Sequence, residues 1–378
     1  MYRIKFISNI FIMVSKKMSK MKKLLKILRT GNYSYFANRL LNKPYLIQWV
    51  PTVRCNLQCS MCHQKDIRAC RESELSFEEA ALMFKNLKAC GINQINLVGG
   101  EFFVRQDAWK ILDLLESMGF LFSIGTNATL LKTEDVAKLS YYWGLTELDI
   151  SLDGADAATH DSIRGVPGTF DKAIEFIKDC KNFDITVMVV AVVQAQNYKK
   201  MIELANLLKS LRVDTFTIVQ EFSITKKVFD NTKQMLERLT NKKVDIFASY
   251  SVRDSTFKYN LEDFKSKMKE LKTHCEKIDL NTNFAFDIDN FDDVYNETRR
   301  QNNICGCDNF GGQIDWQGNV NLCPFIRVSG YDKAHGLIEK SFLEQKDLYK
   351  TRDAIVSMNM MPFCERCCGL KLIKSKKS

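Results

Sequence analysis

The 378-residue chain is 46% hydrophobic, which is ample for a large core, and it carries a formal charge of +10. No run of 18 or more apolar residues is present, so the sequence predicts no membrane-spanning helix. Residues 1–43 hold eleven Lys and Arg and no acid, whereas the rest of the chain is close to neutral. We therefore expect residues 1–44 to be a basic amphipathic extension, which either contacts an anionic membrane peripherally or packs as a solvated helix on the body of the protein.

From residue 45 to residue 220, strand patterns alternate with helix patterns. Strands are predicted near residues 45–50, 95–98, 121–125, 148–151, 185–193 and 214–219. Helices are predicted at 109–118, 134–142 and 170–180, and another begins at Ser76 with a capping-box pattern. Six strands separated by helices predict an α/β fold with a parallel sheet that curls into a partial (β/α)6, TIM-like barrel. The run 185–193 is almost continuously apolar, which is typical of a strand covered on both faces.

Three further regions follow this expected barrel. Residues 221–300 are rich in lysine and acids and predict a helical connector, with helices near 229–239 and 261–271. Residues 301–370 predict a small α+β domain that contains a hairpin at 314–320. Residues 371–378 form a basic tail.

The cysteines are clustered rather than evenly spread. They fall at 55/59/62, 305/307/323 and 364/367/368, with Cys70, Cys90, Cys180 and Cys275 scattered. A chain of this length without a secretory leader is unlike a small disulfide-stapled domain. Short clustered spacings therefore indicate metal ligation in a reducing cytoplasm, and the scattered cysteines are expected to be packed thiols.

The run Cys55-x3-Cys59-x2-Cys62 follows the first expected strand. Three thiolates are one fewer than a closed zinc site or a four-iron cube requires, so this spacing favours an open metal position over structural zinc. Other distinctive residues follow the next three strands: Gly99-Gly100-Glu101, Thr126-Asn127 and Ser151. The carboxyl ends of parallel strands are where such folds place their chemistry.

The cysteine triplet, paired with Gly99-Gly100-Glu101, resembles the radical S-adenosylmethionine superfamily over residues 45–220. The resemblance implies that Cys55, Cys59 and Cys62 hold a 4Fe–4S cluster, whose open iron binds the methionine moiety of S-adenosylmethionine. The reduced cluster then cleaves this cofactor to a 5′-deoxyadenosyl radical, which abstracts a substrate hydrogen. No catalytic residue beyond the cluster is identified. Met61 and Phe102 depart from the usual aromatic and proline at their positions, and neither is a ligand.

The resemblance also implies roles for cofactor-binding residues. Gly99 and Gly100 let the backbone approach the cofactor, Glu101 pairs with its ammonium group, and Ser151 matches a ribose-contacting serine. Thr126 and Asn127 match a T-N-G-like family motif. Two residues keep two interpretations each: Arg164 meets the cofactor carboxylate or forms a structural ion pair, and Val192 packs on the adenine or in the core.

The later cysteines resemble the SPASM/twitch extension of radical enzymes that modify peptides and small molecules. This implies one auxiliary 4Fe–4S cluster on Cys305, Cys323, Cys364 and Cys367. Cys307 is the alternative to Cys305, and Cys368 is the alternative to Cys367. A four-cysteine zinc site is permitted by the spacing as well.

The expected function is that of a radical S-adenosylmethionine enzyme that oxidises or matures a peptide or a small natural-product intermediate, with a reductant such as flavodoxin or ferredoxin. An envelope-sugar, lipid or antibiotic intermediate handled at a membrane surface is the alternative substrate. A zinc-stabilised nucleic-acid-binding protein is the alternative of a different class. The basic extension lacks the interleaved aromatics that stack bases, so we expect no nucleic-acid partner. The chain also lacks a phosphate loop and a dinucleotide fingerprint.

Overall fold

The computed structural model describes residues 46–62, 64, 74–221, 224–241, 243–246, 252–253, 260–289, 291, 303–304, 313–321, 326–328 and 373–374. The expected extension, residues 1–44, lies outside these residues. So do all the cysteines expected to bind an auxiliary cluster, with their alternatives: Cys305, Cys307, Cys323, Cys364, Cys367 and Cys368.

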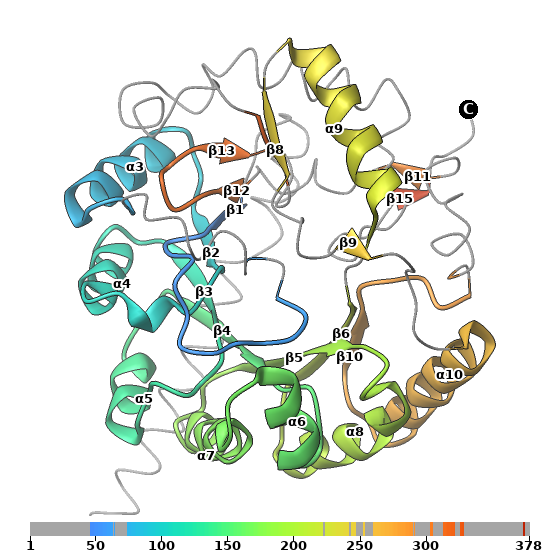
Figure 1. The fold of residues 1–378 in the computed structure, drawn as a ribbon. Coiled ribbons are helices and arrows are strands. Elements are labelled where there is room, and N and C mark those ends of the chain that lie inside the picture. The colour runs from blue at the N-terminus through green and yellow to red at the C-terminus, as the bar shows by residue number, and fades with distance from the viewer. Residues whose placement is uncertain are drawn as a thin grey trace, which may run out of the picture.

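Six parallel strands form the centre of the sheet. They are β1 (Leu46–Trp49), β2 (Gln94–Leu97), β3 (Leu121–Thr126), β4 (Leu145–Ser151), β5 (Val187–Val193) and β6 (Thr215–Gln220). Each pairs in parallel with its neighbour in chain order, and the sheet curls without closing (Figure 1). The predicted α/β fold with a partial barrel is confirmed.

Segments from beyond residue 280 extend the sheet at both edges. β10 (Thr282–Phe284) pairs in parallel with β6. At the other edge β12 (Gln313–Ile314) pairs in parallel with β1, and β13 (Val320–Asn321) pairs antiparallel with β12. The complete order is β10-β6-β5-β4-β3-β2-β1-β12-β13. The predicted hairpin at 314–320 is present, whereas β10 was not predicted because a three-residue strand leaves little pattern in the sequence.

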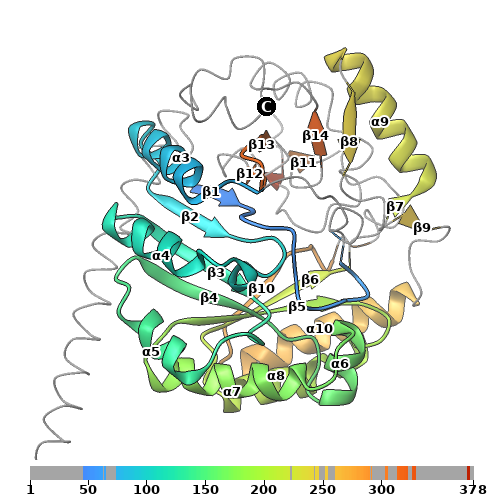
Figure 2. The same cartoon turned by 60° about the vertical axis from the view of Figure 1, so that its left-hand side comes forward.

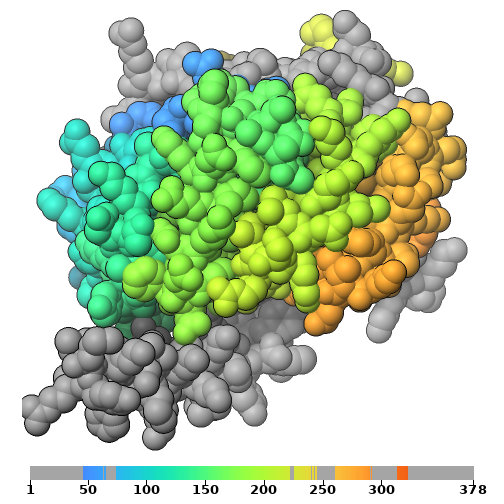
Figure 3. Space-filling model, turned by 90° about the horizontal axis from the view of Figure 1, so that it is seen from below, coloured from blue at the N-terminus to red at the C-terminus, as the bar shows by residue number. Residues whose placement is uncertain are grey.

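Helices cover the outer side of the sheet. These are α3 (Phe77–Ala89), α4 (Ala108–Ser117), α5 (Thr133–Ser140), α6 (Ala157–Arg164), α7 (Thr169–Asn182), α8 (Met201–Ser210) and α10 (Leu261–Lys277). Figure 2 shows them arranged around the outside of the strands, and Figure 3 shows their side chains as a continuous surface from teal to orange. The predicted capping box is present at the start of α3: Ser76 Oγ accepts from the Glu79 N–H at 3.2 Å, and Glu79 Oε2 accepts from the Ser76 N–H at 2.8 Å.

In the part of the chain that the structure describes, two 3-10 helices, one further helix and several short strands lie outside the nine-stranded sheet and its covering helices. The 3-10 helices η1 (Phe102–Val104) and η2 (Tyr198–Lys200) lie within the barrel region. Helix α9 (Lys226–Thr240) belongs to the connector and precedes β8 (Val244–Ile246), which pairs antiparallel with β14 (Ile326–Val328). β7 (Ile224–Thr225) pairs in parallel with β9 (Val252–Arg253), and β11 (Asn303–Ile304) pairs antiparallel with β15 (Ile373–Lys374). Among the described residues, no helix is long and apolar enough to span a membrane.

The main core lies between the sheet and these helices. On β4, Leu148 and Ile150 are fully buried in it, and the residues that alternate with them therefore face the opposite, concave side of the sheet. We call this concave side the inner face. β5 alternates in the same way between buried and half-buried residues. The expectation that this strand is covered on both faces is therefore wrong: its apolar inner residues, such as Val190, are only half-buried because they border the inner face rather than a second layer of helices.

Candidate cluster and cofactor site

The cysteine loop runs from β1 across the carboxyl ends of the strands to helix α6 (Figures 1 and 2). Cys59 is buried, and Cys55 and Cys62 are half-buried. The backbone of the loop is anchored on the end of α6: the Gln58 N–H donates to the Arg164 carbonyl at 3.2 Å, and the Ser60 N–H donates to the Ile163 carbonyl at 2.8 Å. The triplet is therefore held by a helix that lies a hundred residues later in the chain.

Two side-chain N–H groups point at the cysteine sulfurs. Asn127 Nδ2 lies 3.7 Å from Cys55 Sγ, and an Arg164 guanidinium nitrogen lies 3.8 Å from Cys59 Sγ. Asn127 Nδ2 also donates to Asn56 Oδ1 at 2.9 Å, which ties the loop to the end of β3. Donors to thiolate sulfur are the outer partners that stabilise the negative charge of a sulfur-ligated metal group.

The pair Gly99-Gly100 brings the end of β2 against the start of the cysteine loop. The Gly100 N–H donates to the Thr52 carbonyl at 2.9 Å, and the Glu101 N–H donates to the Arg54 carbonyl at 2.8 Å. A Cβ at Gly100 would lie 2.0 Å from the Arg54 carbonyl oxygen, and Gly99 has a φ of +125°. Glycine is therefore required at both positions, because only glycine allows this approach and this backbone conformation.

The Glu101 carboxylate is buried where β2, β3 and η1 meet. It accepts hydrogen bonds from the Thr126 hydroxyl at 3.0 and 3.1 Å, from the Asn127 N–H at 2.7 Å and from the Phe103 N–H at 3.2 Å. Burial raises its pKa to about 7, although these hydrogen bonds act in the opposite direction. Glu101, Thr126 and Asn127, which the sequence placed at the ends of two strands, are thus brought into direct contact.

Arg164 forms a buried ion pair with Asp153. Its Nε lies 2.7 Å from Asp153 Oδ2, and the other carboxylate oxygen of Asp153 accepts the Val192 N–H at 2.8 Å. The Asp153 N–H donates to His160 Nδ1 at 3.0 Å, and burial lowers the pKa of His160 to about 4. The imidazole is therefore a neutral acceptor, and this network connects β4, β5 and α6 directly behind Cys59.

Asp153, two residues after Ser151, was not predicted as part of the site. An aspartate in an apolar strand end must find a cationic or hydrogen-bonding partner if it is buried, and this rule was the available signal. Ser151 lies at the end of β4 on the inner face and pairs in register with Val190 of β5. Val192 is half-buried on the same face as Val190.

Arg105 braces the beginning of the cysteine loop and was also missed. Its buried guanidinium donates to the Pro51 carbonyl at 2.8 Å and to the Leu75 carbonyl at 2.9 Å, and it pairs with Asp107 at 2.7 Å. Glu74 accepts from Arg54 and from Thr52, and the nearby arginines contribute to a lowered pKa of its carboxyl. The cysteine loop is therefore fixed at its start by charge and at its middle by α6.

The donors present suit an iron–sulfur cluster. Three thiols on one loop are the ligands that such clusters take, and amide and guanidinium N–H groups approach two of them. Within the described ranges, no group of three or more His, Cys, Asp or Glu side chains is gathered for a single metal ion. The scattered cysteines Cys90, Cys180 and Cys275 lie in the main core, as expected for packed thiols, and Cys70 lies outside the described residues.

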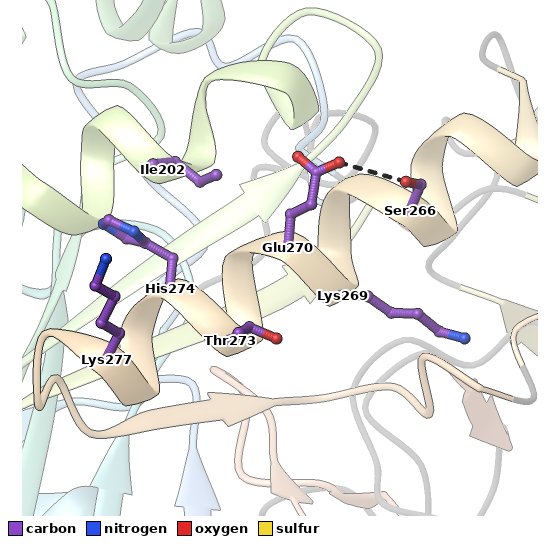
Figure 4. Close-up of a pocket in the computed structure, with 7 residues that line it drawn as sticks. All are labelled: Ile202, Ser266, Lys269, Glu270, Thr273, His274 and Lys277. Atoms are coloured by element: carbon purple, nitrogen blue, oxygen red, sulfur yellow. Dashed lines mark hydrogen bonds between the residues drawn. The ribbon is translucent and has the colours of Figure 1, made fainter.

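A separate hollow lies on the outer surface between α8 and α10 (Figure 4). It has a volume of about 550 Å³ and is lined by Ile202, Ser266, Lys269, Glu270, Thr273, His274 and Lys277. Its Ser266–Glu270 contact is a long 3.4 Å hydrogen bond within one helix. None of the candidate site residues lines this hollow, so it plays no part in the site.

Comparison with known proteins identifies the region that carries this site. The family model described as the radical SAM superfamily matches residues 49–208. An AdoMet-dependent heme synthase of Methanosarcina barkeri is 32% identical over 172 residues, which are 46% of this chain and 49% of that protein. The mycofactocin maturase MftC of Mycolicibacterium smegmatis is 31% identical over 174 residues, which are 45% of this chain and 43% of that protein. The chain thus spans about half the length of these curated relatives.

A solved structure shares the fold over most of the chain. The crystal structure of Streptococcus suis SuiB bound to its precursor peptide SuiA matches with a TM-score of 0.57 at 17% identity and covers 91% of this chain and 76% of SuiB. The radical SAM fold implies a 4Fe–4S cluster and S-adenosylmethionine as cofactors. Residues 49–208 therefore form a radical SAM domain, similar in sequence to the corresponding part of these enzymes.

Proposed function

We propose that the chain is a radical SAM enzyme that holds a 4Fe–4S cluster on Cys55, Cys59 and Cys62 and cleaves S-adenosylmethionine reductively in order to remove a hydrogen from its substrate. When bound, the cluster and S-adenosylmethionine supply the electron and the primary carbon radical for this step. The observation that carries the proposal is the convergence of the cysteine loop, the glycine-lined end of β2 and buried Glu101 at one edge of a parallel sheet.

The residues of the chain position these groups. Arg164 and Asn127 donate toward the sulfurs of Cys59 and Cys55, which would favour the anionic thiolates. Gly99 and Gly100 leave room beside the cluster for the methionine end of the cofactor. Glu101 is the acceptor for its ammonium group, and a cation beside this carboxylate would lower the pKa that burial has raised.

Ser151 and Val192 would receive the nucleoside end of the cofactor. Both lie at the carboxyl ends of adjacent strands, on the inner face and on the side of the sheet where the cysteine loop crosses. Thr126 supports the site indirectly, because its hydroxyl is committed to Glu101. Arg164 is held by Asp153, so its proposed part is to steady the cluster rather than to reach the cofactor carboxylate.

For the substrate we propose a peptide or a small natural-product intermediate. The names of the relatives leave both substrate classes open, because one relative is a heme synthase and another is a maturase named for mycofactocin. SuiB, which shares the fold, was crystallised with its precursor peptide. We further propose an auxiliary 4Fe–4S cluster on Cys305, Cys323, Cys364 and Cys367, and a small electron-transfer protein such as flavodoxin or ferredoxin as the reductant.

The test is anaerobic reconstitution of the full chain with iron and sulfide, followed by addition of S-adenosylmethionine and dithionite. We expect about eight irons per chain from two four-iron clusters, and formation of 5′-deoxyadenosine and methionine. Replacing Cys55, Cys59 and Cys62 together by Ala should remove about half the iron and all cleavage. Cys90→Ala, in the core of the same domain, is the matched control and should retain both. Cleavage by the triple variant would overturn the assignment.

A further inference from the structure

The inner face of β4 carries a carboxyl group that the proposed cofactor chemistry does not use. Leu148 and Ile150 point into the core beneath the helices, so Glu147, Asp149 and Ser151 lie on the inner face. Ser151 is proposed to contact the cofactor. Asp149 lies two residues before it, which is about 7 Å further from the carboxyl edge of the sheet.

One carboxyl oxygen of Asp149 is buried and lacks a hydrogen-bond partner. Its Oδ1 is fully buried and has no hydrogen-bond partner, although the residue as a whole is only half-buried. Among the described residues no cationic side chain pairs with it, and burial together with the nearby charge of Glu147 raises its pKa well above the ordinary value. A buried carboxyl group without a hydrogen-bond partner destabilises a folded protein. Its presence therefore indicates that a bound ligand supplies the missing hydrogen-bond donor.

The inner face carries a second acceptor without a partner, on a strand two places away from β4. Asn96 of β2 is in register with Ser123 of β3, which is in register with Glu147 of β4. Asn96 Oδ1 is also buried without a hydrogen-bond partner. Two acceptor oxygens without partners therefore lie on the inner face, and Asn96 is level with Glu147 but two strands away from it.

The strand next to Asp149 contributes no side chain at its level. Its register neighbour on β3 is Gly125, which has no side chain, and its neighbour on β5 is Met188. A Cβ added at Gly125 would meet only the Leu97 carbonyl oxygen, at the ordinary contact distance of 3.5 Å. A methyl group at this position would therefore fit without a clash and would lie beside Asp149.

We propose that Asp149, with Glu147 two residues before it on the same face of β4, binds a cationic amine or guanidinium group of the substrate on the inner face, directly below the cofactor site. This inference rests on the proposed function, which places the cofactor at the carboxyl end of this face, and it narrows the substrate to a molecule with such a group. A cation of this kind offers an N–H donor to the buried Asp149 oxygen that has no partner, and it forms charge-assisted hydrogen bonds with carboxyl groups. Neutral substrates would leave Asp149 unsatisfied.

The test uses the reconstituted full chain with four small probes: N-acetyl-lysinamide and N-acetyl-argininamide, and their neutral counterparts N-acetyl-norleucinamide and N-acetyl-citrullinamide. Each probe is titrated while the unfolding temperature is recorded. We expect a saturable rise with at least one cationic probe and none with its neutral counterpart. Asp149→Asn should weaken this binding at least tenfold, and Gly125→Ala should weaken it as well because its methyl group fills the space beside Asp149.

The matched control is Asp171→Asn, which alters an exposed aspartate in the first turn of α7 and should bind the cationic probe like the wild type. A second readout separates binding from a structural role. Without probe, Asp149→Asn should unfold at the same temperature as the wild type or at a higher one, since it removes an orphaned acid. A lower unfolding temperature would mean that Asp149 supports the fold, and this would overturn the inference.

Failure of this inference is distinguishable from failure of the proposed function. If the wild type forms 5′-deoxyadenosine but shows no Asp149-dependent preference for the cationic probes, the substrate assignment is overturned and the radical chemistry stands. If no 5′-deoxyadenosine forms while the cationic probe still binds in an Asp149-dependent way, the proposed function fails and the binding assignment stands.

Discussion

Glu101 joins three segments of the site through one carboxylate. Its two oxygens accept from the Phe103 N–H, the Thr126 hydroxyl and the Asn127 N–H, so that the ends of β2 and β3 are fixed relative to each other. Among the described residues no cationic side chain pairs with this buried group, and its pKa is raised to about 7 from an ordinary value of 4.5. An ammonium group placed there would supply the charge that the site lacks.

This pKa predicts how the stability of the cofactor-free protein depends on pH. Between pH 4.5 and pH 7 the unfolded chain has lost the Glu101 proton while the folded protein retains it, so the free energy of unfolding falls as the pH rises. The Glu101→Gln variant has no carboxyl group to titrate at this position, so its free energy of unfolding does not fall for this reason. The stability of the wild type relative to the variant should therefore fall by on the order of 3 kcal/mol across this window and stay constant above it.

Urea unfolding of both proteins between pH 4.5 and pH 8 measures this difference. His160, with its pKa lowered to about 4, has the opposite effect between pH 4 and pH 6.5, but both proteins share it and it cancels in the comparison. Stability curves that run parallel over the whole range would show that Glu101 is ionised when buried.

The ion pair between Asp153 and Arg164 predicts a second effect at the residue scale. Asp153→Ala leaves a buried guanidinium without its partner, which should cost about 3–5 kcal/mol of folding free energy. The exposed pair of Lys200 and Asp156, 3.5 Å apart, is the control, and Lys200→Ala should cost less than about 1 kcal/mol. Urea unfolding at neutral pH measures both, and equal losses would contradict the argument.

The sequence predicted the positions of these candidate site residues in the fold better than it predicted their contacts. Glu101, Thr126 and Asn127 followed from their places at strand ends, because parallel strands bring their carboxyl ends to one edge. The pairing of Arg164 with Asp153 did not follow, since it depends on the angle at which α6 leaves β4. The bond from Arg164 to the Cys59 sulfur joins residues that are 105 positions apart and has no local signal.

At the scale of elements, helix α6 and the cysteine loop form one unit. α6 ends at Gly165, which adopts the left-handed conformation with a φ of +74°. A Cβ at Gly165 would lie 2.7 Å from the Gln58 carbonyl oxygen, within the cysteine loop. The glycine therefore ends the helix and also lets the loop pack against it.

Two glycines in this turn separate backbone strain from contact with the loop. Gly168, at the start of α7, has a φ of +79° and nothing within 4 Å of an added Cβ, so Gly168→Ala should cost about 1–2 kcal/mol from backbone strain alone. Gly165→Ala carries the same strain and also pushes the Gln58 backbone away. It should destabilise the protein more and lower the iron retained on the cysteine loop.

Urea unfolding and iron analysis after anaerobic reconstitution measure both effects. Gly168→Ala should keep the iron content of the wild type while losing stability. Equal iron content in Gly165→Ala would mean that the cysteine loop adapts to the added methyl group without moving its thiols.

The whole sheet depends on residues far beyond the radical SAM domain. β10 covers the edge of β6, and β12 covers the edge of β1, so neither outer strand of the six-stranded barrel is left unpaired. Trp316, in the turn after β12, packs against Val50 and Val53 at the start of the cysteine loop. The sequence predicted the hairpin from its turn residues but gave no sign of its attachment to β1, because that pairing is set by tertiary packing.

This arrangement predicts that residues 46–225 do not form a well-behaved fragment. They contain all six central strands but lose β10, β12 and β13, which exposes the backbone donors and acceptors of β1 and β6 along two apolar strands. Open apolar edges pair with other chains, so we expect the fragment to aggregate where the full chain runs as a discrete species on size-exclusion chromatography. Trp316→Ala in the full chain is the milder test, since it keeps β12 and removes only the packing on Val50 and Val53. It should retain the discrete species yet unfold at a lower urea concentration. A monomeric fragment with a single sharp unfolding transition would show that the central six strands stabilise themselves.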